Sequence, residues 1–238
     1  MNSDQTLPHS KKLIIIGIGS TGRRILNFVR AHRLYDVAGF AVNAAYKTAD
    51  EFQGLPLHAL EGLSERERRE HCFFVAVQWN HLNAQRRHMY EECTGMGLEL
   101  VNLISPLAST YAGEIRGRNC WIQDGVVLQT GAVVSEDTIV AAGALLGNDC
   151  SIGSHCFVGA HAAIGGMARI GEQTFVGINA TVFPGTTVGR KCILGAATAI
   201  KRNVPDFSRY STASDNIVIK TYTEEEVEDK LVSGRNIH

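Results

Sequence analysis

A short stretch in the middle of the chain carries the side chains best suited to proton transfer. Asn148 and Asp149 are adjacent, and His155 and His161 follow them at a spacing of one hexapeptide. An unperturbed imidazole titrates near neutral pH, so either histidine could take a proton from an attacking nucleophile. A carboxylate is a weaker base unless burial raises its pKa. An asparagine amide accepts no proton at this pH, but it can hold a substrate or donate a hydrogen bond.

A glycine-rich segment near the amino end has the spacing of a phosphate site. The sequence GIGSTG (17–22) follows the apolar run KLIII and precedes a helical pattern of apolar residues. Backbone N–H groups at the start of such a helix suit a pyrophosphate. We therefore predict ligand contacts at Gly17, Gly19, Ser20, Thr21 and Gly22. The alternative is that the glycines only permit a tight turn between strand and helix.

The first part of the chain, up to Ile104, alternates strand-like and helix-like segments. Continuous apolar runs alternate with stretches of helical period, which is typical of a small parallel sheet with helices on both faces. The expected strands are Lys12–Gly17, Asp36–Val42, Cys72–Val77 and Leu98–Ile104, and the expected helices are Ser20–His32, Leu60–His71 and His81–Cys93. The second strand runs into Asn43, with no carboxylate to hold a ribose, so NAD is not expected.

A six-residue rhythm organises the chain from Ile122 to Ile200. Every sixth residue is aliphatic, and the residue four places later is small or β-branched. Three hexapeptides would close one triangular coil, with the aliphatic side chains inside and successive coils about 4.8 Å apart. Glycine, which follows the aliphatic residue in most hexapeptides from Leu146 onward, permits the turn. The pattern predicts a parallel β-helix, preceded by an irregular first coil at Ile104–Trp121.

The bulk properties limit the classes of protein. We predict a flexible tail over residues 1–10, a Rossmann-like domain over 11–104, a β-helix over 105–204, and a cap with a surface segment over 205–238. The net charge of −1 and the lack of a long apolar run point to neither nucleic acid nor membrane as a partner, and we expect a cytoplasmic protein. The six cysteines show no metal-site spacing, so we expect buried, reduced thiols and no metal.

The order of these two domains resembles a known family. An N-terminal KLIIIGIGSTGRR followed by a hexapeptide β-helix is similar to the left-handed β-helix acyltransferases that modify nucleotide-linked amino sugars in bacteria. The branch includes the acetyltransferases of the sialic-acid and bacillosamine pathways. The resemblance covers Lys11 to about Val204. It implies N-acetyl transfer from acetyl-CoA to an amino sugar, for surface polysaccharide or glycan synthesis, with O-acetyl transfer as the alternative.

The resemblance also implies an assembly and a cofactor site. The family forms homotrimers, with acetyl-CoA in the groove between adjacent β-helices. The corresponding contact residues here are Gly159, Gly165, Gly177, Asn179, Gly195, Lys201 and Arg202. The two basic residues would meet the cofactor's phosphates; the alternative is that they are ordinary solvated charges. Relatives often carry an acidic pair where Asn43 stands, so the contact with the nucleotide differs here.

One position departs from the family pattern. The catalytic histidine of the family aligns with Asn148, which precedes Asp149. Three explanations remain open. Another residue is the base, with Asp149, His155 and His161 as candidates, and a neighbouring subunit could supply either histidine. Alternatively, the amine loses its proton to water and the site supplies only placement. The third is that the protein binds a nucleotide sugar or a partner protein without catalysis.

Overall fold

The computed structural model describes residues 11–77, 81–110, 113–213 and 216–226. The chain divides into two compact units. The first unit ends at residue 78 and resumes over 88–103, and the second comprises 79–87 and the chain from 104 onward. The predicted functional boundaries at residues 104 and 204 stay predictions. The predicted tail, residues 1–10, lies outside the described residues.

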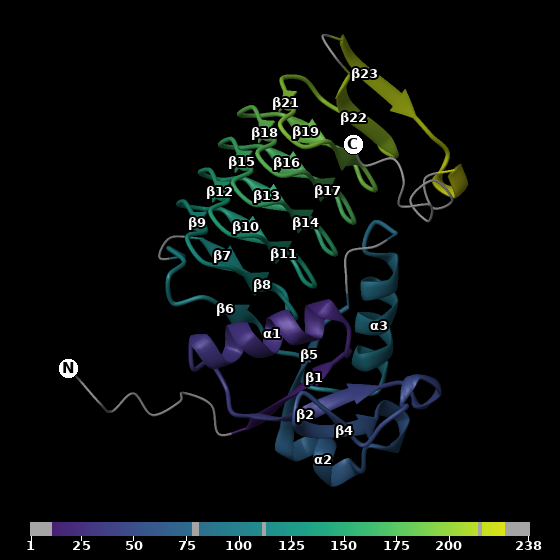
Figure 1. The fold of residues 1–238 in the computed structure, drawn as a ribbon. Coiled ribbons are helices and arrows are strands. Elements are labelled where there is room, and N and C mark those ends of the chain that lie inside the picture. Colours follow the sequence, from purple (N-terminus) through teal and green to yellow (C-terminus); the bar gives the residue numbers. More distant parts are fainter. Residues whose placement is uncertain (1–10, 78–80, 111–112, 214–215, 227–238) are drawn as a thin grey trace, which may run out of the picture. The chain divides into compact units, whose positions relative to one another are not determined.

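The first unit is a five-stranded sheet with the strand order β3-β4-β2-β1-β5. All neighbours are parallel except the hairpin of β3 and β4. Figure 1 shows its elements. They are β1 (Lys12–Ile16), α1 (Ser20–Ala31), β2 (Val37–Val42), a 3-10 turn at Ala44–Tyr46, β3 (Glu51–Phe52), β4 (Leu55–Ala59), a 3-10 turn at Leu60–Gly62, α2 (Glu65–Glu70), β5 (His71–Val75) and α3 (Ala84–Gly95).

Both faces of this sheet are buried, as the continuous apolar strands predicted. Ile14 and Ile16 of β1 belong to a buried cluster that includes Cys93 of α3. On the opposite face Ile15 pairs in register with Phe40, and the Cβ position of Gly22 in α1 lies 3.6 Å from the Phe40 ring. The predicted small parallel sheet of Rossmann-like type is confirmed, with an antiparallel hairpin added at its edge.

Three details of the predicted elements were wrong. The hairpin β3–β4 was not predicted; its turn uses Gln53 and Gly54, both at positive φ, as hairpin turns of this kind require. The helix expected from Leu60 begins only at Glu65, where Ser64 forms a capping box with Glu67. The strand expected over Leu98–Ile104 is only a parallel bridge at Leu100 and a two-residue strand, because the chain leaves the first sheet there.

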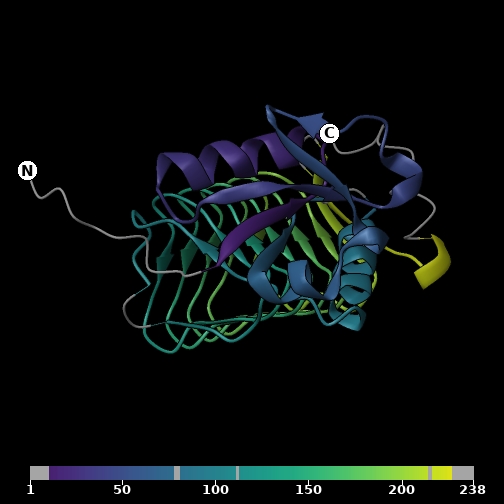
Figure 2. The same cartoon turned by 90° about the horizontal axis from the view of Figure 1, so that it is seen from below.

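The second unit is a parallel β-helix whose short strands fall into three rows (Figure 1). Each strand pairs with the third strand after it in the chain, as in Leu145 with Ala163 and Ala163 with Thr181. Figure 2 shows the coils from below. The parallel β-helix predicted from the hexapeptides is confirmed, and so is the left hand that the resemblance implied. The irregular first coil is also present, and a bridge from Ser109 to Val127 forms one of its walls.

Each row of strands is one sheet. The three sheets are named here for β7, β8 and β9, three consecutive strands that each belong to a different sheet. The β7 sheet contains β7 (Glu114–Ile115), β10 (Val133–Val134), β13 (Ser151–Ile152), β16 (Arg169–Ile170) and β19 (Thr187–Val188). The β8 sheet contains β6 (Leu103–Ile104), β8 (Trp121–Ile122), β11 (Ile139–Val140), β14 (Phe157–Val158), β17 (Phe175–Val176), β20 (Ile193–Leu194), β22 (Ser208–Ala213) and β23 (Asn216–Thr221). The β9 sheet contains β9 (Val127–Leu128), β12 (Leu145–Leu146), β15 (Ala163–Ile164), β18 (Thr181–Val182) and β21 (Ala199–Ile200).

The interior of the β-helix follows the sequence period. All fourteen aliphatic residues of the hexapeptide series are at most 3% exposed and form one continuous core. After Ile200 the rhythm stops, and β22 covers the last coil by pairing with β20. The six cysteines are buried and free, as predicted. Within the described part of the chain, no helix is both long and apolar enough to span a bilayer.

Candidate active site

Each coil has three turns, so the β-helix has three edges. Each edge is named here for the two strands that its first turn connects. The β7–β8 edge comprises the turns 116–120, 135–138, 153–156, 171–174 and 189–192. The β8–β9 edge comprises 123–126, 141–144, 159–162, 177–180 and 195–198. The β9–β10 edge comprises 129–132, 147–150, 165–168 and 183–186. The predicted catalytic residues are distributed over all three, so one chain does not bring them together.

The turns on all three edges use the same backbone device. Each places one residue in the left-handed region, as at His155 (φ 58°), Asp149 (φ 56°) and His161 (φ 56°). Asparagine, aspartate and histidine tolerate this conformation better than most side chains. These residues are therefore explained locally by the turn, and their surroundings must decide whether they also do chemistry.

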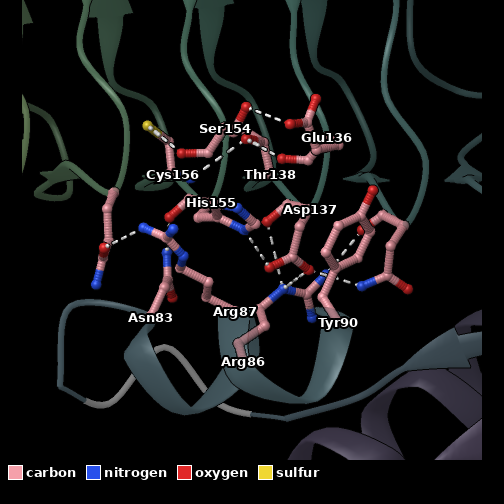
Figure 3. Close-up of polar contacts among 12 residues, drawn as sticks. Asn83, Arg86, Arg87, Tyr90, Glu136, Asp137, Thr138, Ser154, His155 and Cys156 are labelled. Carbon is pink, nitrogen blue, oxygen red and sulfur yellow. Dashed lines mark hydrogen bonds and ion pairs between the residues drawn. The ribbon is translucent and has the colours of Figure 1, made fainter. Parts of the chain in front are cut away.

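The β7–β8 edge is closed by another segment of the same unit. Figure 3 shows Asn83, Arg86 and Arg87 pointing from the start of α3 toward the turns of this edge. Asn83 Nδ2 donates to the carbonyl oxygen of His155 over 2.6 Å. Arg87 Nη1 donates to Gln173 Oε1 over 3.3 Å. The three side chains contact successive coils because residues three and four apart share one face of a helical turn.

A buried ion pair lies at the centre of this contact. Arg86 Nε is 2.8 Å from Asp137 Oδ1, and neither side chain is exposed. Asn119 donates to the same carboxylate over 2.7 Å, and His155 Nδ1 lies 2.9 Å from Asp137 Oδ2. His155 is only 6% exposed. It therefore takes part in this buried network, and little of its ring is exposed.

The β9–β10 edge is open at Asn148 and Asp149. Both residues are exposed. The Asn148 N–H donates to Oε1 of Gln129, one coil below, over 3.2 Å. The Asp149 carboxylate lies over Gly131, where an added methyl group would be 2.1 Å from Oδ1. The glycine one coil earlier in the chain thus makes room for this side chain.

The β8–β9 edge is open at His161. Its imidazole lies over Gly143, 2.5 Å from where a Cβ atom would be, and the residue is exposed. His161 and Asn148 therefore flank the β9 sheet on its two opposite edges. Both remain candidate catalytic residues, together with Asp149.

A shallow groove of about 230 Å³ lies on the β9 sheet beside Asn148. Its walls are mostly apolar or glycine, as suits an extended acyl-carrying chain. The lining residues are Gln129, Leu145, Gly147, Ala163, Ile164, Gly165, Gly166, Thr181, Val182, Phe183 and Pro184.

The glycines predicted to contact the cofactor are held by the stacking of coils. A Cβ atom on Gly159, Gly165 or Gly177 would lie within 2.7 Å of backbone in the next coil. Their N–H groups, and that of Gly195, already donate within the β-helix. Only Gly165 of these four lines the groove. Among the described residues, the N–H of Gly166 has no backbone acceptor. The backbone donor that a ligand could reach therefore belongs to the residue after Gly165.

The other predicted cofactor residues are exposed at the surface of the β-helix. Asn179 lies on the β8–β9 edge at positive φ. Lys201 and Arg202 follow β21, at the end of the β9 sheet, and Lys201 Nζ lies 5.5 Å from the centre of the Phe183 ring. Because Phe183 lines the groove, one cation stands at the groove's end.

In the first unit, the glycine loop has the geometry that its spacing predicted. Gly17 has φ +119°, and a Cβ on Gly22 would lie 2.2 Å from the Gly17 oxygen. Gly19 precedes α1, with nothing within 4 Å of its Cβ position and no side chain capping the helix. Ser20 is exposed and Thr21 is buried. The amino end of α1, where the first backbone N–H groups of a helix lack partners within it, therefore has no side-chain cap.

A carboxylate that the sequence did not reveal lies beside Asn43. Asn43 Nδ2 donates to Glu92 Oε1 over 2.9 Å. Glu61 accepts from the next backbone N–H, that of Ala44, over 2.8 Å. The end of β2 is therefore acidic, although no acidic residue is adjacent in sequence.

Sequence reasoning also missed Asn119, Asp137 and Arg86. A signal for the first two was present, because Asn119, Asp137 and His155 are each spaced one full coil apart and so fall on one edge of the β-helix. No comparable signal marks Arg86, since nothing in the sequence connects that position with this edge.

Comparison with known proteins places this geometry among acyltransferases. Residues 167–202 match the hexapeptide repeat of succinyl-transferase. A His-to-Asn variant of perosamine N-acetyltransferase from Caulobacter crescentus, solved with CoA and GDP-perosamine, superposes with a TM-score of 0.76 at 27% identity, covering 89% of this chain and 97% of that one. No curated protein sequence matches the chain.

Two further solved structures share the fold. The acetyltransferase domain of PglB from Neisseria gonorrhoeae FA1090, solved with acetyl coenzyme A, has a TM-score of 0.73 at 26% identity and covers 86% of this chain and 97% of that chain. WeeI from Acinetobacter baumannii AYE has a TM-score of 0.65 at 13% identity, with coverage of 87% and 100%, and shows the fold alone.

Proposed function

We propose that this chain, which belongs to the left-handed β-helix acyltransferases of the nucleotide-sugar branch, acetylates an amino group of a nucleotide-linked amino sugar. The observation that carries the proposal is the match to two acetyltransferase structures over nearly their whole length, first unit and β-helix together. One of these relatives was solved with CoA and GDP-perosamine, a nucleotide-linked amino sugar. A GDP-linked amino sugar is therefore the first probe of this chain's acceptor.

The acyl donor is acetyl-CoA. We assign its pantetheine arm to the groove on the β9 sheet, where apolar walls would bury the chain and the open N–H of Gly166 would bind an amide carbonyl. Lys201 and Arg202 would meet the phosphates beyond Phe183. Asn179, on the other edge of the sheet, stays a predicted contact.

We assign the acceptor's phosphates to the glycine loop of the first unit. Gly17 and Gly22 let strand and helix approach closely, and no side chain caps the amino end of α1, the end of a helix that suits an anion. Asn43, with Glu92 beside it, lies at the end of the next strand, where sheets of this type hold the sugar of a nucleotide. Ser20 supplies an exposed hydroxyl, while Thr21 is buried and offers only its backbone.

The reaction joins the sugar nitrogen to the acetyl carbon as the C–S bond breaks. The amine attacks in its neutral form, loses one proton as the C–N bond forms, and the departing thiolate of CoA takes up a proton. Holding both reactants together lowers the barrier by roughly 7 kcal/mol or more, because association entropy is lost on binding. Asn148 can hold the substrate or donate to the thioester oxygen, and a base must come from elsewhere.

The absence of a histidine at residue 148 favours N- over O-transfer. An amine is a better nucleophile than a hydroxyl group and needs less help from a base. The same absence supports the second candidate, a catalytically silent homologue that binds a nucleotide sugar or a partner protein. In the perosamine enzyme, a variant with one histidine changed to asparagine was solved with both ligands bound.

Assembly as a homotrimer and a cytoplasmic location stay predictions. Flat walls of β-helices expose wide faces, and packing three side by side would bury them. A trimer would also form the clefts that the proposed donor site requires. Mass measurement of the native protein in solution tests the trimer directly.

The test is acetyl transfer to a panel of nucleotide-linked 3-amino and 4-amino sugars, starting with GDP-perosamine. We expect CoA release, detected with a thiol reagent, together with a mass increase of one acetyl group on the acceptor. A hydroxyl-only acceptor panel distinguishes O-transfer. Tight binding of a nucleotide sugar with no CoA release from any acceptor would contradict the enzyme and support the silent homologue.

A further inference from the structure

The exposed large apolar side chains of the β-helix surround its β9 sheet, and one of them, Leu145, is on the sheet itself. Among the described residues they lie on the β9 sheet or on the two edges that border it. They are Leu107, Leu145, Met167, Ile178 and Phe183, between 38% and 66% exposed. The outward residues of the β7 sheet are instead mostly polar, such as Arg169 and Thr187. An apolar face of this kind marks a contact surface.

Two polar side chains on the borders of this face are a carboxylate and an imidazole, which together could make an acid–imidazole pair. Asp149 is on the β9–β10 edge and His161 on the β8–β9 edge, and in the described structure neither side chain has a hydrogen-bond or ion-pair partner. On the closed β7–β8 edge, by contrast, Asp137 and His155 meet within one chain at 2.9 Å. There the carboxylate and the imidazole stand one full coil apart, one above the other. Asp149 and His161 are separated by two hexapeptides and lie on opposite edges, so a chain cannot pair them itself.

A ring of identical copies would bring the two edges together. If each copy turns its β9 sheet toward an axis parallel to the β-helices, the β9–β10 edge of one copy faces the β8–β9 edge of the next. Each residue keeps its height along the axis in such a ring. Two hexapeptides are two thirds of a coil, so the two backbones differ in height by only about 3 Å, given a coil spacing of about 4.8 Å. Both side chains lean toward the preceding coil, His161 over Gly143 and Asp149 over Gly131, so the difference in height stays at about 3 Å.

We propose that His161 of one copy is the catalytic base for the site at Asn148 of the neighbouring copy, with Asp149 there orienting its imidazole. The occupant of the β9 face is thus a second copy of this chain, because another copy can bring His161 to the edge that carries Asp149. This proposal rests on the proposed function. The imidazole takes the amine proton as the C–N bond forms and returns it to the CoA thiolate as the C–S bond breaks. The neighbouring copy thus supplies a base beside Asn148, although residue 148 is not itself a histidine.

A disulfide crosslink tests the juxtaposition without reference to activity. The variant D149C/H161C is oxidised and analysed on a non-reducing gel. The native cysteines are all buried, so background crosslinking is low. We expect covalent oligomers of closed size, whereas R169C/H161C, with one cysteine on the exposed β7 sheet, should stay monomeric. Monomers from both variants, or equal crosslinking in both, would overturn the proposal.

Mixed oligomers test the catalytic role. H161N should lower kcat by about 100-fold or more, as loss of a general base does, and D149N by a smaller factor. When the two variants are denatured together and reassembled, about one boundary in four joins an intact Asp149 to an intact His161, so about a quarter of wild-type activity should return. Differently tagged chains verify mixing. No recovery in verified mixed oligomers would overturn the role of His161.

The two readouts separate this proposal from the proposed function. A wild-type chain that transfers no acetyl group would contradict the proposed function, and the crosslink would still decide whether the edges meet. Crosslinking without complementation would show that the copies associate this way but that His161 is not the base, which also overturns the proposal.

Discussion

The β7–β8 edge and the β9–β10 edge are built from the same type of turn, but the first is covered by another segment and the second is exposed. Both place one residue of each turn in the left-handed conformation, and this residue is Asp137 or His155 in two turns of the first edge and Asp149 in one turn of the second. On the β7–β8 edge the segment at the start of α3 covers them, and Arg86 neutralises Asp137 in the interior. On the β9–β10 edge Asp149 stays exposed beside an apolar groove. The repeat thus provides equivalent positions on every edge, and a segment outside the repeat determines which of them remain exposed.

The interior corners differ in the same way. Under the β7–β8 edge, cysteine and threonine alternate as Cys120, Thr138, Cys156, Thr174 and Cys192. Each donates to a carbonyl of a neighbouring turn, as Cys156 does to Gly171 at 3.1 Å and Thr174 to Gly189 at 2.9 Å. Under the β8–β9 edge, the equivalent residues of three successive coils are alanines. The β7–β8 edge is therefore held by hydrogen bonds both inside and outside the β-helix, and we expect it to be more rigid than the β8–β9 edge.

The largest effect should follow from removing the buried charge of Arg86. R86A leaves the Asp137 carboxylate buried without its cation, which costs about 3–5 kcal/mol of unfolding free energy. Urea titration followed by circular dichroism measures the loss. R116A is the matched control, because it breaks the exposed Arg116–Glu114 pair and should cost less than about 1 kcal/mol. Equal losses in the two variants would show that the closed edge is not special.

Alkaline conditions should weaken the corner under the closed edge. Burial raises the pKa of Cys156 from 9.0 to about 12. The folded chain therefore keeps a proton that the unfolded chain releases, so stability is intact below pH 9 and falls as the pH rises toward 12. At about pH 10.5 each such thiol costs about 2 kcal/mol.

C156T should remove part of that alkaline loss, and T174C, in the same column one coil away, should add to it. The measurement is the urea midpoint at about pH 8 and at about pH 10.5 for both variants and the wild type. An alkaline loss that neither substitution changes would assign the loss to other groups.

A smaller effect should distinguish the β9–β10 edge from the β8–β9 edge, because each carries an equivalent glutamine. Gln129 and Gln123 each accept the N–H of the residue 19 places later, that of Asn148 and that of Ala142, both over 3.2 Å. Only Gln129 lines the groove. Q129A should lower kcat/KM for acetyl transfer by up to about tenfold, the worth of one hydrogen bond, while Q123A should leave it unchanged. Steady-state kinetics that fall equally for both variants would make the effect structural.

The smallest effect should come from a glycine on the open edge. Gly185 has φ +69°, with nothing within 4 Å of its Cβ position. Asparagine tolerates this conformation, as Asn119 does on the closed edge at φ 61°. G185N should therefore change the unfolding free energy by no more than about 0.5 kcal/mol, measured by thermal melting. A large loss would show that the contact with the neighbouring copy at the β9–β10 edge extends to Gly185.

Much of the fold could be predicted because the repeat is local. The aliphatic residue of each hexapeptide, such as Leu146, turns inward wherever the period holds, and the length of one coil fixes its neighbours above and below. The glycine loop at 17–22 was similarly readable, since a positive φ at Gly17 and the close approach of Gly22 are properties of neighbouring residues. The hairpin β3–β4 was missed because its strands are too short to show a period.

The candidate site was only partly predictable, because it depends on contacts between distant residues. The sequence offered His155 and His161 as equivalent, and it could show that one hexapeptide separates neighbouring edges. That Arg86 and Asn83 would cover His155 is a contact between segments far apart in the chain, for which spacing carries no signal. The carboxylate of Glu92 beside Asn43 is a contact of the same kind.

The residue pattern alone was enough to predict a small parallel sheet followed along the chain by a β-helix, because a hydrophobic period is a property of neighbouring residues. The pattern also shows an asparagine, not a histidine, at residue 148. Three features came from contacts between distant residues: His155 is buried, Asn148 and His161 flank one groove-bearing sheet, and one edge in three is closed. The physical reason is that burial is set by whatever packs against a turn, and the packing partner of a turn can come from any part of the chain.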